Sequence, residues 1–398
     1  FRADTMDCCR NIWRYIYILD DTLQVSENDI LTGELDTFFK KEKNVRPTLQ
    51  PQKYYWGAFW IQNEDITKDF FLSFPFDISE LVFYEVLEDA VVKRKVGSLV
   101  SKIETQDDAP VASVDYFFRV TLTKSVPRKF YFKIKDESGR IEKGFFSPNV
   151  WNVEQFYEKA IIRTRQTIFF EGAVGIFLLL NLVLFFYLRT RPFFHFVLYL
   201  ICILVYGFFS SGLMKQWDIF GNIPELKFFI RLNYYLVSIS YLAFMRSFLE
   251  MEKMLPSWYQ VFKWLIRTAA ILMMISTLYL AFIRYNVALI DTVYGIYLIT
   301  AFSIIIIFLF PLFKIKDIRA KFIFWGSILI ILGVVPSIAT LLFGLFGIDN
   351  VVFVQLGLAG EMVVFSLGLA YSHSTSEREK QEAFRRRAVM EEKSKIYA

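Results

Sequence analysis

Long apolar stretches recur through the chain after residue 166, and they constrain its fold more than any other feature. Each is about 20 residues long, enough for a helix rising about 1.5 Å per residue to cross a hydrocarbon layer of roughly 30 Å. The hydrophobic fraction of 55% also exceeds that of ordinary soluble domains. We therefore predict a bundle of seven membrane-spanning helices. The predicted spans are 167–187, 193–214, 228–249, 261–283, 287–312, 320–346 and 351–371.

The first 160 residues differ, because their apolar runs are short and are separated by charges and turn residues. Apolar and polar side chains alternate along Val114–Leu122 and along Lys129–Lys135, which is typical of strands with one buried face. Several short strands of this kind favour a two-layer sandwich, and we expect a jelly roll. The other predicted strands are Tyr15–Leu19, Tyr54–Gln62, Phe70–Phe74, Leu81–Leu87 and Val91–Val96.

These two patterns divide the chain into four predicted parts. An all-β jelly-roll sandwich covers residues 10–150, and a connecting helix covers 151–166. The seven-helix bundle follows at 167–371, and a charged tail occupies 372–398. The tail contains no Pro or Gly, so we expect the last membrane helix to continue into it.

Basic residues in short loops predict the orientation, because loops rich in Lys and Arg stay on the inner side of the membrane. With the N-terminal domain outside, the inner loops hold Arg189, Arg191, Lys253, Lys263, Lys314, Lys316, Arg319 and Lys321. The outer loops hold Lys215, Lys227 and Arg284. The asymmetry favours an external N-terminal domain and a cytoplasmic C-terminus. Export of that domain requires a signal peptide, so we expect either that one was removed before Phe1 or that the sequence is a fragment.

No pattern in the sequence supports catalysis. There is neither a nucleotide-binding Gly-rich loop nor a His-Glu-x-x-His metal motif, and the two histidines, His195 and His373, are far apart. We therefore predict that this chain is not an enzyme and has no catalytic residues, metal or cofactor. The net charge of +5 includes no basic stripe on the first domain, so nucleic acid is not an expected partner.

Ionisable residues within the spans are costly in lipid and usually face the bundle interior. Glu171, Arg231 and Asp291 each lie about one helical turn from the outer boundary of a predicted span. One interpretation is a polar cluster that responds when the outer domain moves; a static ion pair, or side chains reaching to the interface, is the other. Glu361 lies near mid-membrane beside Gly360, where a carboxyl must be paired or protonated. A coupling role and a packing role both remain open for it.

A dense aromatic run, Tyr54–Trp60, is the best candidate for ligand contact in the first domain. Strand alternation places Tyr55 on one face, and Trp56 and Trp60 on the other. If the Tyr55 face fills the core, the two tryptophans form an exposed or groove-facing platform able to stack on a sugar ring. The alternative is that both tryptophans pack under a loop or in a second layer.

Several short motifs follow one another in an informative order. They are Tyr15–Asp20 with Ser26–Ile30, Tyr55-Trp56 through Asn63, Glu171-Gly172 with Asn181-Leu182, Tyr199, Gly207–Gly212, and Gly360-Glu361 through Ala370. In this order they resemble the bacterial seven-transmembrane receptors with diverse intracellular signalling modules, although Gly57 and Ala58 replace the larger residues usual there. The resemblance implies a jelly-roll sensory domain of carbohydrate-binding type, a receptor bundle and a C-terminal output domain such as a histidine kinase or a cyclase. The chain stops about where that domain would begin, so we expect a truncated gene or a tail that acts through a partner.

The combined prediction is a transmembrane sensor in the inner membrane of a bacterium. An extracellular small molecule or carbohydrate would bind the periplasmic sandwich, and the bundle would transmit the change to a cytoplasmic signalling partner. The lipid bilayer is a further partner, and a homodimer is left open. A transporter or channel with an accessory binding domain is the main alternative, although it would need a polar pathway through mostly apolar spans. A membrane enzyme and an adhesion or scaffold protein are weaker alternatives.

Overall fold

The computed structural model describes residues 3, 9–21, 25–40, 53–64, 67–74, 78–87, 90–101, 103–109, 113, 115–138, 148–216, 229–282, 286–343 and 350–396. Val114, at the start of one predicted strand, and residues 217–228 and 344–349 lie outside the described part of the chain. The chain forms two compact units. The first comprises 1–168, 205–234 and 271–296, and the second comprises 169–204, 235–270 and 297–398.

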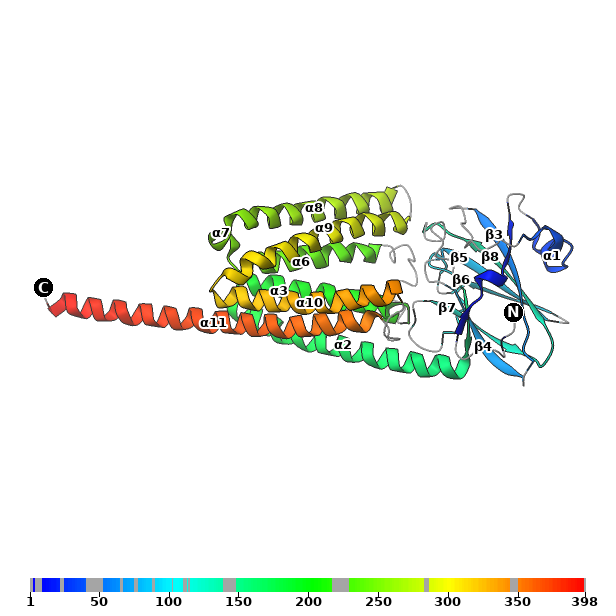
Figure 1. The fold of residues 1–398 in the computed structure, drawn as a ribbon, viewed down its shortest axis with the longest axis horizontal. Coiled ribbons are helices and arrows are strands. Elements are labelled where there is room, and N and C mark those ends of the chain that lie inside the picture. The colour runs from blue at the N-terminus through cyan, green and yellow to red at the C-terminus, as the bar shows by residue number, and fades with distance from the viewer. Residues whose placement is uncertain are drawn as a thin grey trace. The chain divides into compact units, whose positions relative to one another are not determined.

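The first unit contains a β domain with nine described strands in two antiparallel sheets (Figure 1). They are β1 (Cys9–Asn11), β2 (Tyr17–Asp20), β3 (Tyr54–Ile61), β4 (Lys68–Phe74), β5 (Glu80–Val86), β6 (Val91–Val96), β7 (Tyr116–Leu122), β8 (Arg128–Lys135) and β9 (Asn149–Asn152). The sheet orders are β1-β9-β4-β7 and β2-β3-β8-β5-β6. Apart from β2 at one edge, eight strands form two four-stranded sheets, and every neighbouring pair in them except β5–β6 is distant in sequence. This is the connectivity of a jelly roll, so the predicted fold is confirmed.

Alternation along the strands fills the space between the two sheets. Phe118 and Val120 of β7 and Phe130 and Phe132 of β8 belong to one large buried cluster, whereas Arg119 is exposed. In the register of β3 and β8, Gly57 lies opposite Phe132, and a Cβ at Gly57 would lie 2.0 Å from the Phe132 ring. Gly57 therefore leaves the room that this ring occupies in the core.

A second, smaller cluster covers the other face of the five-stranded sheet. Short helices supply part of its cover: α1 (Glu27–Leu31), which Ser26 caps by accepting a hydrogen bond from the Asn28 N–H, and η2 (Asp36–Phe38). The cluster contains Ile30, Phe39, Trp56, Ala58, Val82, Tyr84 and Tyr131. Both faces of β3 are thus buried, one in each cluster.

The chain enters the helical part through α2 (Val153–Leu188), a single helix of 36 residues. The Asn152 side chain accepts a hydrogen bond from the Glu154 N–H at 3.0 Å, as expected of an N-cap. The connecting helix was predicted to begin at residue 151, but residues up to Asn152 pair as β9 with β1 and β4. The predicted connecting helix and first span are therefore one continuous element.

Six described helices are long and apolar enough to cross a membrane, and one shorter helix accompanies them. The six are α2, α3 (Arg191–Ser210), α8 (Pro256–Phe282), α9 (Val287–Lys314), α10 (Ile318–Phe343) and α11 (Asn350–Ile396). The seventh is α6 (Asn233–Phe248), whose 16 residues directly follow the turn η4 (Ile230–Leu232). The remaining short elements are η1 (Trp13–Tyr15), α4 (Leu213–Gln216) and α7 (Met251–Met254). The protein is therefore a multi-pass membrane protein with a β domain.

Within the second unit, α10 and α11 pack closely through small residues. A Cβ at Gly333 would lie 2.6 Å from the Phe353 carbonyl oxygen, and one at Gly357 would lie 2.8 Å from the Leu329 carbonyl oxygen. Helices in lipid associate mainly through such close packing, since burial of apolar surface provides no driving force between them. Gly333 and Gly357 therefore allow the backbones of the two helices to approach closely.

Candidate signal-transmission site

Glu361 of α11 is a completely buried carboxyl, with 0% of its surface exposed. The Tyr199 hydroxyl of α3 donates a hydrogen bond to Glu361 Oε2 at 2.6 Å. The other oxygen, Oε1, has no hydrogen-bond partner among the described residues. The sequence predicted that this carboxyl would need a partner, and the partner is a phenol rather than a cation.

Two further hydroxyl groups extend this contact to α6 and α10. The Tyr241 phenol of α6 interacts with the Glu361 carboxyl, and its ring lies 5.4 Å from the Tyr199 ring. The Tyr241 and Ser327 hydroxyls are 3.2 Å apart. We call these four residues the Glu361 cluster. Hydroxyl groups both donate and accept, so the cluster can rearrange its hydrogen bonds without transferring net charge.

Aromatic packing surrounds the cluster on the same helices. The Phe365 ring, about one turn along α11, lies 4.9 Å from the Phe244 ring and 6.2 Å from the Phe196 ring. A Cβ at Gly326 of α10 would lie 2.2 Å from the Phe365 ring. Little space is left here, so a shift of α11 has to displace its neighbours as well.

Asn181 connects α2 to α11 at Ser366, which follows Glu361 closely in the sequence. Its side-chain amide donates to the Phe177 carbonyl at 2.8 Å and to the Ser366 hydroxyl at 3.2 Å. Asn181 is 2% exposed; its amide nitrogen makes both hydrogen bonds, whereas its Oδ1 has no partner among the described residues. The sequence identified Asn181 only as part of a resemblance, without its partner.

The predicted polar cluster of Glu171, Arg231 and Asp291 is formed only in part. Arg231 Nη1 lies 2.8 Å from Asp291 Oδ2, and the arginine is 5% exposed, so the ion pair between η4 and α9 is present in the first unit. Glu171 belongs to α2 in the second unit. Neither of its carboxylate oxygens has a hydrogen-bond partner among the described residues. The place of Glu171 in the cluster therefore stays a prediction.

The aromatic candidates on β3 differ in exposure. Tyr55 is 7% exposed and belongs to the main core, as the alternation predicted. Trp56 is 0% exposed and packs in the second cluster, 5.4 Å from the Tyr84 ring. Trp60 is 37% exposed, with Lys129 Nζ lying 5.1 Å from its ring. An exposed platform of two tryptophans is thus wrong for Trp56, because α1 and η2 help to cover its side of the sheet.

The segment that follows α3 is attached to the β domain within the first unit. Lys215 Nζ lies 2.6 Å from Asp107 Oδ2 and donates to the Asp115 carbonyl at 2.5 Å. Burial lowers the pKa of Lys215, and the Asp107 carboxylate opposes that shift. Gly212 has φ +81°, and a Cβ there would lie 2.5 Å from the Ser113 backbone. The sequence identified Lys215 only as a loop charge; its carboxylate partner, distant in the chain, gave no local signal.

These features define a membrane protein that combines a jelly-roll domain with a helical bundle held together at buried polar residues. A family model described as 7TM diverse intracellular signalling matches residues 165–372, more than half of the 398-residue chain. The chain belongs to this family of transmembrane signalling proteins, which confirms the suspected resemblance. No curated protein matches the chain.

Proposed function

We propose that this protein is a receptor that binds a ligand with its β domain and transmits a conformational signal to a cytoplasmic partner. The observation that carries the proposal is α11, which is one helix from Asn350 to Ile396 and holds Glu361 in its buried cluster (Figure 1). A rearrangement at Glu361 would move the tail as well, because both belong to one helix.

Two contacts in the first unit support a route for the input. Lys215 attaches the end of α3 to Asp107 of the β domain. At the start of α9, the Ala288 N–H donates to the Ser138 carbonyl at 3.1 Å. Lys215 lies in α4, just after α3, and α3 is continuous from Arg191 to Ser210, so a displacement passed from α4 into α3 would reach Tyr199. Coupling further requires that the ligand bind two arrangements with different affinity.

For the ligand we favour a carbohydrate, contacted at Trp60. The half-exposed indole lies edge-on to Tyr17, with ring centroids 5.6 Å apart, and Lys129 holds a charge beside it. Ligand sites commonly combine aromatic surface with a few placed polar groups. Trp56 and Tyr55 would then support the Trp60 surface from inside the domain rather than touch the ligand.

The proposed orientation places the β domain outside the cytoplasmic membrane of a bacterium and the tail inside. The distribution of basic residues supports it, with Arg189 and Arg191 after α2 and Lys314 and Lys316 after α9 on the inner side. In this proposal the enzymatic step of signalling belongs to the cytoplasmic partner. A homodimer joined through the tail would offer that partner a pair of helices.

The test uses the full chain in lipid nanodiscs and a panel of soluble oligosaccharides, including β-glucan and chitin fragments. We expect at least one to bind and to change hydrogen exchange in residues 361–396. Binding that leaves exchange in α11 unchanged would overturn the coupling. Failure of the whole panel to bind would remove carbohydrate as the ligand class.

A pair of lysine variants isolates the proposed route. Lys215→Met removes the charge that contacts Asp107, so we expect ligand binding to persist while the change in α11 is lost. Lys124→Met removes an exposed lysine elsewhere in the β domain and should behave as the wild type. Equal responses in the two variants would exclude the Lys215 contact as the input.

A further inference from the structure

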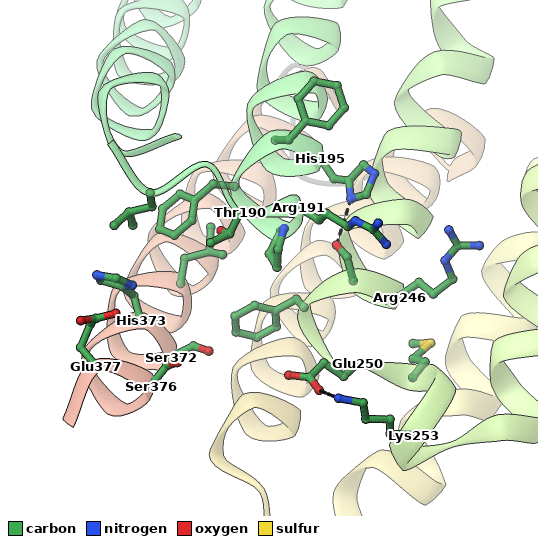
Figure 2. Close-up of a pocket in the computed structure, with 18 of the residues that line it drawn as sticks. Thr190, Arg191, His195, Arg246, Glu250, Lys253, Ser372, His373, Ser376 and Glu377 are labelled. Carbon is green, nitrogen blue, oxygen red and sulfur yellow. Dashed lines mark hydrogen bonds and ion pairs between the residues drawn. The ribbon is translucent and has the colours of Figure 1, made fainter. Parts of the chain in front are cut away.

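A large cavity lies in the second unit where α11 continues into the tail. Its volume is about 1470 Å³, and its walls come from the α2–α3 turn, the end of α6, α7, the start of α8, and α11 (Figure 2). We call it the tail-side cavity. None of its lining residues belongs to the Glu361 cluster, so it is a separate feature of the bundle.

Two arginines in the wall have no acidic partner among the described residues. Arg191 is the first residue of α3, and Arg246 lies near the end of α6. Both guanidinium groups interact electrostatically with His195, whose Nδ1 lies 3.0 Å from the Ser247 hydroxyl. The Tyr259 ring, 5.3 Å from Arg246 Cζ, is the contact that orients this arginine. Like charges gathered without a carboxylate are a site for an anion.

The remaining charges of the cavity are largely neutralised already. Glu250 pairs with Lys253 at 3.1 Å and with Arg319 at 2.9 Å. On α11, Glu377 pairs with Lys380 at 2.9 Å. Hydrogen bonds from Lys253 and Arg319 lower the pKa of Glu250, so it stays ionised and keeps those cations occupied. The other carboxylate of the wall, Glu252, is exposed on α7.

The donors around the two arginines suit a phosphate group. The first turn of α3 lines the cavity, and the N-terminus of a 20-residue helix carries a partial positive charge, although Pro192 in that turn has no N–H to donate. Thr190 and Ser372 add hydroxyl groups to the wall (Figure 2). Arginine binds phosphate oxygens with two parallel hydrogen bonds, which makes these interactions strong and directional.

Neighbouring aromatic residues favour a lipid as the source of that phosphate. Tyr187, at the end of α2, is 83% exposed, and Phe194 in the first turn of α3 is 47% exposed. Both line the cavity and both face outward from the bundle, where aromatic rings mark the interface between hydrocarbon and headgroups. A headgroup could enter the cavity while its acyl chains remain beside these rings.

We propose that the tail-side cavity binds the phosphate of an anionic phospholipid headgroup, with Arg191 and Arg246 as its main ligands. The bound phosphate connects α3 to α6 and lies beside Ser372, so it holds α11, which continues into the tail, against these two helices. Such a site makes the position of the tail sensitive to the lipid composition of the inner leaflet. It does not depend on the proposed receptor function, since it is measured as binding.

The experiment measures lipid binding to the purified full chain in a neutral detergent by native mass spectrometry. Phosphatidylglycerol is compared with phosphatidylcholine, whose phosphate is shielded by choline, and with diacylglycerol, which has none. We expect phosphatidylglycerol to bind at least ten-fold more tightly than either. Inorganic phosphate and glycerol phosphate form a separate arm: if they bind as tightly as the lipid, the source is a free anion and the lipid assignment is overturned.

Matched variants identify the ligands. R191Q/R246Q should weaken phosphatidylglycerol binding about ten-fold or more, since two charge-assisted contacts are lost. Lys253 lines the same cavity, but its charge is already paired with Glu250. The affinity of K253Q for phosphatidylglycerol should therefore stay within about two-fold of the wild type. Equal losses in R191Q/R246Q and K253Q, or no loss in either, would overturn the proposal.

Two further arms keep the test decisive. Should R191Q/R246Q fail to fold, R191Q alone serves, because Arg191 is exposed and its replacement leaves the packing intact; we expect a loss of at least three-fold. A poly-glutamate peptide is the probe for an acidic protein partner. Tighter binding of that peptide than of phosphatidylglycerol, lost in the same variant, would assign the cavity to a protein and overturn the lipid site.

Discussion

A buried carboxyl is held differently in two regions of the molecule: Glu85 of the β domain pairs with cations, whereas Glu361 of the second unit has no cationic partner among the described residues. Glu85 lies 3.2 Å from Arg94 and 2.8 Å from Arg128, and its side chain is 10% exposed. Glu361 is more completely buried, and the Tyr199 hydroxyl donates to its carboxyl at 2.6 Å. The same chemical group is therefore held by two strong charges in one region and by phenols in the other.

The difference teaches where the molecule is rigid and where it can rearrange. Removing one partner of a buried ion pair leaves an uncompensated charge and costs several kcal/mol, so the β domain resists rearrangement at Glu85. A hydrogen bond to a hydroxyl contributes only about 1 kcal/mol and can be exchanged for another. The Glu361 cluster is thus suited to adopt more than one arrangement, which a signalling bundle requires.

Replacing Trp56 should have the largest effect on the stability of the β domain. Trp56→Ala should lower the free energy of unfolding by about 4 kcal/mol, because a fully buried indole leaves a large cavity. Trp60→Ala, on the same strand but half-exposed, should cost about 1 kcal/mol. Chemical denaturation of the full chain in detergent, followed by circular dichroism, measures both. Equal costs for the two variants would mean that the second cluster does not stabilise the domain.

Breaking the buried ion pairs of Glu85 tests the comparison directly. Glu85→Leu leaves Arg94 and Arg128 without this carboxylate and should lower the free energy of unfolding by about 3 kcal/mol. Glu27→Gln removes an exposed pair with Lys93, 2.8 Å long, and should cost less than about 1 kcal/mol. Both values come from the same denaturation curves. A cost below about 1 kcal/mol for Glu85→Leu would remove the contrast between the two regions.

Substitutions of Glu361 test whether this carboxyl, unlike Glu85, depends on hydrogen bonds rather than on charge. Glu361→Ala leaves the Tyr199 hydroxyl buried without its acceptor and should cost about 1–2 kcal/mol. Glu361→Gln keeps an acceptor without the possibility of charge, so it should lie within about 0.5 kcal/mol of the wild type. Thermal unfolding in nanodiscs measures both variants. If Gln is as damaging as Ala, the charge of the carboxyl matters and the contrast with Glu85 fails.

The smallest expected effect is a pH dependence in the β domain. A hydrogen bond from the Thr121 hydroxyl, followed by the contact with Arg119, lowers the pKa of Asp69. Its stabilising contribution is full above the unfolded pKa of about 3.9 and is lost as the pH falls through the lower folded value. Asp69→Asn should therefore differ from the wild type by at most about 1 kcal/mol at neutral pH and not at all at about pH 2. A difference that persists in acid would contradict the assigned cause.

Most of the β domain follows from local pattern, and its exceptions have a physical reason. Alternation along β7 and β8 locates the strands and the buried face, because one face of each contacts the core. In contrast, β1 and β9 have three and four residues, too few for a period to be recognised. Residues near Val150 also favoured a helix, and pairing with β4 overrode that preference.

The candidate site could be predicted only in part, because its residues are distant in sequence. Glu361 and Arg231 stand out as ionisable groups in apolar surroundings, so the sequence identifies them. Tyr199 is separated from Glu361 by 162 positions, and its aromatic ring alone does not distinguish it from other residues of a membrane helix. Trp56 shows a different limit of prediction. The alternation along the strand predicted which face carries Trp56, but it could not predict that α1 and η2 cover that face.

Because α11 is one continuous helix, the direction in which each face of its tail points is fixed by the membrane-spanning part. Each residue of an α-helix turns the chain by about 100°, so one residue inserted after Tyr371 would point the distal face of the tail in a new direction. Seven inserted residues would return that face to within about 20° of its original bearing. A partner that binds one particular face of the tail would thus lose its response after insertion of one residue and regain it after insertion of seven. A partner that only needs to be near the tail would respond in both variants.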